Sequence, residues 1–401
     1  MRRGLLGLSR TIITLGVVSL LQDLSTEMLL PLIPLFLTNV LGAPVTAIGI
    51  IEGVAESVAS LLRVWAGWLA DRFGRPKLLA VLGYGLSSVA KPFLAAATAW
   101  PHVFIVRFAD RFGKGIRSAP RDVIIAESAP MEVRGKAFGF HRAMDTTGAV
   151  LGPLVAWAII RHYAGHYAGP RAPYVAVFLI GAVPALMAVA VLAALVPEKP
   201  REARAEAPVK IQWSAFSTRL KLLLLVVTVF SIGNSSDAFL ILRAKDLGVS
   251  VEHVLLIYVL FNAVSAAFSL PAGIISDRVG RGPVIVVGML IFAGAYLGFA
   301  AATTARSAWL LFGVYGLYPG LTAGVLRAYA ADLAPAHLRG TAIGAYYTLE
   351  GLALLPASVI AGLLWDHVGR PAPFYFGAAT AALAALLLLA LLPGRNQTSA
   401  E

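Results

Sequence analysis

Long apolar runs recur along nearly the whole chain, and they constrain its fold more than any other feature. A window of about 20 predominantly apolar residues is long enough to cross a lipid bilayer as a helix. Of the 401 residues, 58% are hydrophobic and only 13% are charged, whereas soluble domains are near half apolar and a quarter charged. A soluble protein of this length could not hide so much apolar surface in a core. We therefore expect an all-α integral membrane protein.

Twelve such windows can be placed, each joined to the next by a more polar segment. They predict transmembrane helices near residues 11–36, 46–69, 78–98, 102–124, 138–160, 173–195, 218–241, 252–272, 283–303, 308–330, 339–364 and 371–392. The first window follows two arginines, as in a secretion signal, but no small-residue cleavage site comes after it. We interpret it as a retained first helix.

Lysine and arginine are unequally divided between the two sides of these predicted helices. The net charge is +12, and most basic residues fall in the connections on the side of both termini. Basic residues are enriched in cytoplasmic loops, so we expect both termini in the cytoplasm and the protein in the plasma (inner) membrane. The scatter of basic residues over short connections also argues against nucleic acid as a partner.

The two halves of the chain repeat each other. The segment 67–75 reads Gly-Trp-Leu-Ala-Asp-Arg-Phe-Gly-Arg, and 273–281, after the eighth window, reads Gly-Ile-Ile-Ser-Asp-Arg-Val-Gly-Arg. Ala129-Pro130 returns as Ala334-Pro335 at nearly the same spacing. Transporter folds are often built from such repeats. The sequence therefore predicts two pseudo-symmetric six-helix bundles, 1–196 and 215–401, joined by a cytoplasmic linker at 197–214.

The segment 67–75 resembles the cytoplasmic loop signature of the major facilitator superfamily, and 273–281 is similar to its degenerate second copy. With the span count, the linker and the repeat, this resemblance covers essentially the whole chain. It implies a monomeric secondary active transporter that works by alternating access. It also implies that the loop acids form a latch when the cytoplasmic side is closed, the alternative being a turn with orientation charges. The gating motif then comprises Gly67, Asp71, Arg72, Gly74, Arg75, Gly273, Asp277, Arg278, Gly280 and Arg281.

A Gly-Pro run at 148–153 partly resembles the antiporter-type signature in helix five of the same family. The matching residues are Gly148, Gly152 and Pro153, but the paired glycines expected next are replaced by Leu-Val-Ala. The match favours export as the direction of transport, and the spacing of the two glycines also suits close helix packing.

Charged residues at membrane depth are the strongest functional signal, because each costs about 2.5–3.5 kcal/mol to insert. At about 100° per residue, the charges of the fourth window share an arc of about 140°. This face must point into the bundle, since lipid cannot accept it. It either binds an anionic substrate or pairs with acids of windows one, five and eleven and gates the pathway. The charges are Arg107, Asp110, Arg111, Lys114, Arg117, Arg121 and Asp122.

Acids recur in other windows at places that the repeat makes equivalent. Asp145 corresponds to Glu350, and Glu27 lies close to the equivalent of Asp237. A buried carboxylate can exchange protons near neutral pH, so we expect at least one acid, Glu27 or Asp145 first, to couple protons. The alternative for each acid is a salt bridge. The candidate coupling acids are Asp23, Glu27, Asp110, Asp145, Asp237 and Glu350, and the candidate cavity cations are Arg107, Arg111, Lys114, Arg142 and Arg327.

Two prolines interrupt predicted helices, Pro92 after Lys91 in the third window and Pro319 in the tenth. Proline removes a helical hydrogen bond and kinks a helix. These kinks serve either as hinges or as packing adjustments.

Signatures of catalysis are missing from the sequence. The chain has no cysteine, which excludes thiol nucleophiles and zinc thiolate sites, and it has no Walker loop for ATP. We expect no enzyme, metal or cofactor, and the proton gradient as the energy source. The leading hypothesis is proton-coupled export of small amphiphilic or drug-like molecules. The alternatives are transport of a small organic anion, including a phosphorylated one, and a non-transporting membrane sensor.

Overall fold

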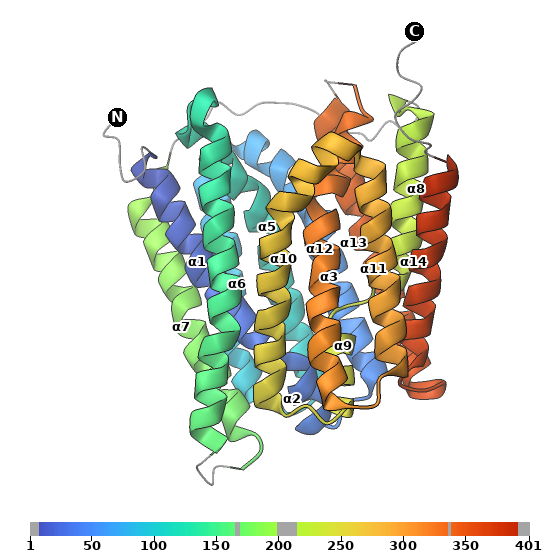
Figure 1. Cartoon of the computed structure of the whole chain (residues 1–401). Coiled ribbons are helices and arrows are strands. Elements are labelled where there is room, and N and C mark those ends of the chain that lie inside the picture. The colour runs from blue at the N-terminus through green and yellow to red at the C-terminus, as the bar shows by residue number, and fades with distance from the viewer. Residues whose placement is uncertain (1–7, 165–168, 199–214, 336–337, 392–401) are drawn as a thin grey trace. The chain divides into compact units, whose positions relative to one another are not determined.

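Every element of the described part of the protein is a helix (Figure 1). The computed structural model describes residues 8–164, 169–198, 215–335 and 338–391. The predicted linker therefore lies outside the described residues from residue 199 onward. In the first half of the sequence the helices are α1 (Arg10–Leu29), α2 (Ile33–Asn39), α3 (Val45–Phe73), α4 (Pro76–Ala90), the 3-10 helix η2 (Lys91–Ala96), α5 (Trp100–Ser128), the short η3 (Met131–Val133), α6 (Arg134–Ala164) and α7 (Ala172–Leu195). In the second half they are α8 (Thr218–Gly233), α9 (Ala238–Asp246), α10 (Val251–Val279), α11 (Arg281–Ala301), α12 (Ala305–Asp332), α13 (Arg339–His367) and α14 (Ala372–Leu391).

Together these helices make twelve membrane spans, in which α1 with α2 and α8 with α9 each count as one span. Eleven are long and apolar enough by hydropathy. The twelfth is α5, which has the length of a span, 29 residues, but carries the charged face predicted for the fourth window. The predicted fold of twelve transmembrane helices is thus confirmed, and α5 departs from the others because its charges lower its hydropathy.

Two predicted spans are broken in the middle, at places that the repeat makes equivalent. The first span is α1 followed by α2, and Pro31 lies in the turn between them. The seventh span is α8 followed by α9, with non-helical backbone at Asn234, Ser235 and Ser236. Proline lacks the N–H that a helix needs, and asparagine and serine side chains compete for backbone groups. Each span was expected as one continuous helix.

The predicted kink after Lys91 takes the form of a change in helix type. Helix α4 ends at Ala90, and the chain tightens into the 3-10 helix η2 from Lys91 onward. In contrast, α12 continues through Pro319 without a break in helical structure.

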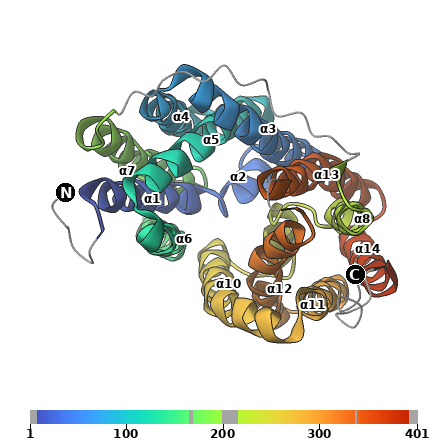
Figure 2. The ribbon, with the colours of Figure 1, turned by 90° about the horizontal axis from the view of Figure 1, so that it is seen from above.

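The described residues group into two compact units. Within the described ranges, the first consists of residues 8–43, 54–164, 169–198 and 251–259, and the second of residues 44–53, 215–250, 260–335 and 338–391. In the first unit α1 packs against α6 and α7, and α4 packs against α5. In the second unit α11 packs against α12 and α14 (Figure 2). The domain boundaries drawn from the sequence stay a prediction.

Glycines bring α4 and α5 into backbone contact. A Cβ placed on Gly83 would lie 2.6 Å from the carbonyl oxygen of Gly113 and 2.8 Å from the backbone nitrogen of Arg117. No side chain fits between the two helices at this level, so only glycine allows this approach. The contact fixes the direction of the charged face of α5 against α4.

The Gly-Pro run of α6 packs in the same way on α1. A Cβ on Gly148 would lie 2.7 Å from the carbonyl oxygen of Leu20, and one on Gly152 would lie 2.7 Å from that of Leu24. The glycines therefore serve helix packing, and they set the acids of α1 beside those of α6.

Candidate functional site

The charged face of α5 is buried inside the first unit. Arg107 and Arg111 are each 3% exposed, and Asp110 and Arg117 are almost as deeply buried. Buried charges persist only when they are paired or hydrogen-bonded. The partners of these side chains therefore decide what the face can do.

Three arginines of this face pair with acids, and one of them, Arg121, lies 2.9 Å, Nη2 to Oδ1, from the adjacent Asp122. Arg111 lies 2.9 Å, Nε to Oε1, from Glu56 of α3, a side chain that keeps 30% of its surface exposed. Arg107 lies 3.5 Å, Nη1 to Oδ2, from Asp110 on its own helix. Of the two hypotheses for this face, the pairing hypothesis places the acids on the first, fifth and eleventh windows, and for Arg111 that placement is wrong. Glu56 lies on the second window, and periodicity within one helix cannot show which neighbour it faces.

Lys114 differs from the arginines beside it. Its side chain is half-buried and makes no hydrogen bond or ion pair with any residue in the described ranges. The charges that act on it most are Arg111 and Glu56, followed at longer range by Arg63 and Asp23. Lys114 is thus a cation on the buried side of α5 whose N–H donors are free to bind a ligand.

A second cluster lies where α1 meets α6. Ser19 donates a short hydrogen bond to Asp145, and His141 Nδ1 lies 3.5 Å from the other oxygen of that carboxylate. Asp23 of α1 is close enough for the charge of Asp145 to act on it. Glu27 lies one turn further along α1, against Gly152. The structure therefore brings together three of the six predicted coupling acids.

The next two acids lie among tyrosines in the second unit. Tyr315 donates a hydrogen bond of 2.8 Å to Asp237, just before α9, and Tyr346 donates one of 3.1 Å to Glu350. Asp110, the sixth predicted acid, accepts a short hydrogen bond from Ser87. The repeat predicted that acids recur in both halves, but the tyrosines around them carry no sequence signal.

The remaining predicted cations are more exposed. Arg327 donates to the carbonyl of Ala323 at 2.8 Å and to the hydroxyl of Tyr347 at 3.1 Å. Arg142 is exposed on α6. Neither residue shares the buried environment of Arg107 and Arg111.

The two loop motifs make the tight turns that their glycines allow. Gly74 and Gly280 have φ of 60° and 96°, values that favour glycine. Arg281 lies 2.6 Å from Asp277 and 3.1 Å from Asp332, which ends α12. Arg72, Arg75 and Arg278 are exposed. The side chain of Asp71 and the surroundings of Gly67 lie outside the described part, so the predicted latch stays a prediction.

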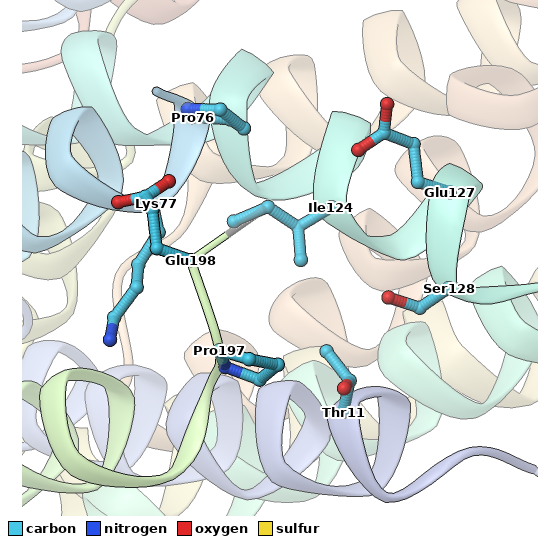
Figure 3. Close-up of a pocket in the computed structure, with 8 residues that line it drawn as sticks. All are labelled: Thr11, Pro76, Lys77, Ile124, Glu127, Ser128, Pro197 and Glu198. Atoms are coloured by element: carbon cyan, nitrogen blue, oxygen red, sulfur yellow. The ribbon is translucent and has the colours of Figure 1, made fainter. Parts of the chain in front are cut away.

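One pocket opens at the ends of α1, α4 and α5 (Figure 3). It holds about 270 Å³ of empty space, open solvent included. Its lining residues are Thr11, Pro76, Lys77, Ile124, Glu127, Ser128, Pro197 and Glu198. The Lys77 ammonium is already bound to the carbonyl of Ala193 at 2.8 Å. No prediction from the sequence concerned this pocket.

Comparisons with known proteins agree with this architecture. The sequence model of the Major Facilitator Superfamily matches residues 15–243 and 223–401. An uncharacterized MFS-type transporter of Methanocaldococcus jannaschii is 36% identical over 388 residues, which is 95% of each chain. A probable 4-methylmuconolactone transporter of Cupriavidus pinatubonensis is 25% identical over 354 residues, 83% of this chain and 78% of the relative. The crystal structure of a mutant of the nucleoside transporter NupG superposes with a TM-score of 0.80 at 15% identity, over 96% of this chain and 100% of that one.

Proposed function

This chain belongs to the major facilitator superfamily, and on that premise we propose that it carries a small organic anion across the membrane by alternating access. The observation that carries this proposal is Lys114, a half-buried cation with unused donors beside the Arg111–Glu56 pair. Ion pairing neutralises Arg107 and Arg111. Arg117 is held by the Tyr84 ring and by the amide oxygen of Gln22. Among the described residues, Lys114 is therefore the cation of this face whose donors are left for a ligand. A carboxylate or phosphate group satisfies such an ammonium by charge-assisted hydrogen bonds.

A relative supports the same class of substrate. The probable transporter from Cupriavidus pinatubonensis is named for 4-methylmuconolactone, a compound that carries a carboxylate. We infer a substrate with one anionic group, which contacts Lys114 while Arg111 stays bound to Glu56. This favours the anion hypothesis, which the sequence alone placed second.

We further propose that protons drive the transport through the cluster of α1 and α6. Asp145 accepts a hydrogen bond from Ser19 and lies beside His141, and its charge acts on Asp23 of α1. Two carboxylates that share a confined site repel each other, and we propose that this pair carries the coupled proton. The charge of Asp23 acts on Lys114. Release of the proton from this pair therefore changes the electrostatic environment of Lys114.

The direct test is thermal stabilisation of the purified protein by a panel of carboxylates, organic phosphates and lipophilic cations. A ligand raises the melting temperature by mass action. We expect an anion to stabilise the native protein but not Lys114→Met. A charge-assisted hydrogen bond contributes about 1.5–3 kcal/mol, so the affinity should fall about 10- to 100-fold.

Lys136→Met is the matched control, because it removes the same charge from an exposed position on α6. This variant should keep the full shift with the anion. An unchanged shift in Lys114→Met would contradict the proposal.

Pairing of Arg107 and Arg111 favours a second candidate, the proton-coupled export of amphiphilic molecules, because a nearly neutral face suits an uncharged or cationic substrate. In that case only lipophilic compounds stabilise the protein. Asp145→Asn then removes their shift, and Lys114→Met leaves it unchanged.

The membrane and the assembly state follow from charge and family. We propose the plasma (inner) membrane, with both termini in the cytoplasm, because basic residues concentrate in the connections on the side of the termini. We also propose that the protein works as a monomer. Reaction of single engineered cysteines with a membrane-impermeant reagent tests the orientation, and light scattering of the detergent complex tests the assembly.

A further inference from the structure

Lys91 is a buried cation that the transport proposal does not use. It stands where α4 gives way to the 3-10 helix η2, and it is only 2% exposed. Its ammonium donates to Ser25 Oγ at 2.9 Å and to Thr26 Oγ1 at 2.9 Å, both on α1. These distances are those of ordinary hydrogen bonds from a charged nitrogen.

A third oxygen comes from Gln22, which is 1% exposed. With its amide oxygen toward the cations, Gln22 accepts from Lys91 Nζ at 3.1 Å and from Arg117 at 2.8 Å. With the amide oxygen and nitrogen exchanged, the NH₂ group would face both cations. The hydrogen-bond network therefore fixes the orientation in which the oxygen faces them. Lys91 therefore has three neutral oxygens around it, all from one stretch of α1.

No carboxylate touches this ammonium within the ranges that the structure describes. Asp110 and Asp23 act on Lys91 through space, and Arg117 and Arg111 oppose them. Buried lysines are normally paired with an acid. A cation held directly by hydroxyl and amide oxygens is instead the coordination that proteins give to small hard cations.

We propose that Ser25, Thr26 and Gln22 form a binding site for a small monovalent cation of the ammonium class, and that Lys91 occupies it permanently with its own ammonium. The tethered charge joins α1 to the junction of α4 and η2. When the side chain is removed, the three oxygens and the space left behind can take up a free ammonium ion. The inference is independent of the transported substrate.

The experiment uses Lys91→Ala in detergent and compares ammonium, potassium and choline chlorides at equal ionic strength. Ammonium should raise the melting temperature of Lys91→Ala in a saturable way, and choline, which is too large for the space of one ammonium group, should not. The native protein should show no such difference between salts. Lys91→Ala/Ser25→Ala should lose most of the shift because one oxygen ligand is gone.

Lys91→Met supplies a matched control, since it fills the same volume with an uncharged chain and should not respond to ammonium. If Lys91→Ala is recovered folded only in ammonium chloride, as a single peak in size-exclusion chromatography, the proposal is supported. Equal stability of Lys91→Ala in ammonium and choline overturns it, as does aggregation in every salt. A response retained in Lys91→Met also overturns it, because the site would then not be the one that the lysine fills.

Discussion

Removing one member of the Arg111–Glu56 pair should destabilise the protein far more than removing both. Arg111 is almost fully buried, and its guanidinium lies 2.9 Å from the Glu56 carboxylate. Loss of one partner of a buried pair leaves an uncompensated charge and costs about 3–5 kcal/mol. Because Glu56 keeps 30% of its side chain exposed, solvent screens it and we expect a cost below that range, about 2–3 kcal/mol, for Arg111→Met.

The double variant Arg111→Met/Glu56→Gln replaces both charges by neutral groups of similar size. It should recover most of the loss, with a coupling free energy of about 2 kcal/mol, within the range for contacting residues. The four proteins can be compared by reversible unfolding in mixed detergent and denaturing micelles, read by circular dichroism. Lys114→Met belongs in the same series and should be close to native in stability, since no ion pair of the described residues is broken.

Strict additivity of the two single changes would mean that Arg111 and Glu56 are each satisfied by other groups. The charged face of α5 would then not be neutralised by pairing, and Lys114 would not differ from Arg111 as a ligand for an anion.

Three further changes test other parts of the structure. Gly152→Ala should lower the free energy of unfolding by about 1–3 kcal/mol through overpacking, because its Cβ would lie 2.7 Å from a backbone oxygen of α1. Gly139 on the same helix has open space around it, so Gly139→Ala should be neutral or stabilising in the same unfolding assay. Arg243→Ala should cost about 2–4 kcal/mol, because Arg243 donates to carbonyls at the end of α11 at 3.0 and 2.8 Å. Its exposed neighbour Arg370, changed to alanine, should lower the melting temperature much less. Arg281→Ala should change stability by no more than about 1 kcal/mol, because its partner acids are exposed. An effect on transport rate without one on stability would support a gating role.

The buried face of α5 could be predicted because it depends on one helix alone. Charges at helical spacing in a membrane span have a single acceptable direction, away from lipid. The pairing of Arg111 could not be predicted in the same way. Glu56 is also charged and also on a span, but the approach of α3 to α5 depends on contacts such as Gly115 with Ala59 and Leu62, and these join residues far apart in sequence.

The two broken spans also depend partly on local sequence and partly on tertiary packing. Pro31 lies at the interruption of the first span, but the apolar run continues on both sides of it, so hydropathy alone predicts one continuous helix. The break at Asn234 depends on polar side chains that compete with the backbone and on packing that shields the freed groups. The hydrogen-bond partners of Lys91 could not be predicted either, because Ser25 and Gln22 look like ordinary polar residues of a helix.

The contact between Gly83 and Gly113 has a consequence for how the protein moves. Because the two backbones touch, α4 and α5 cannot slide or separate at this level without opening a void that neither lipid nor a side chain fills. The two helices should therefore move together as one rigid body in the collective conformational change that carries a substrate. Any displacement of α5 at Lys114 is then passed on to α4, and through α4 to the junction at Lys91, without a hinge between them.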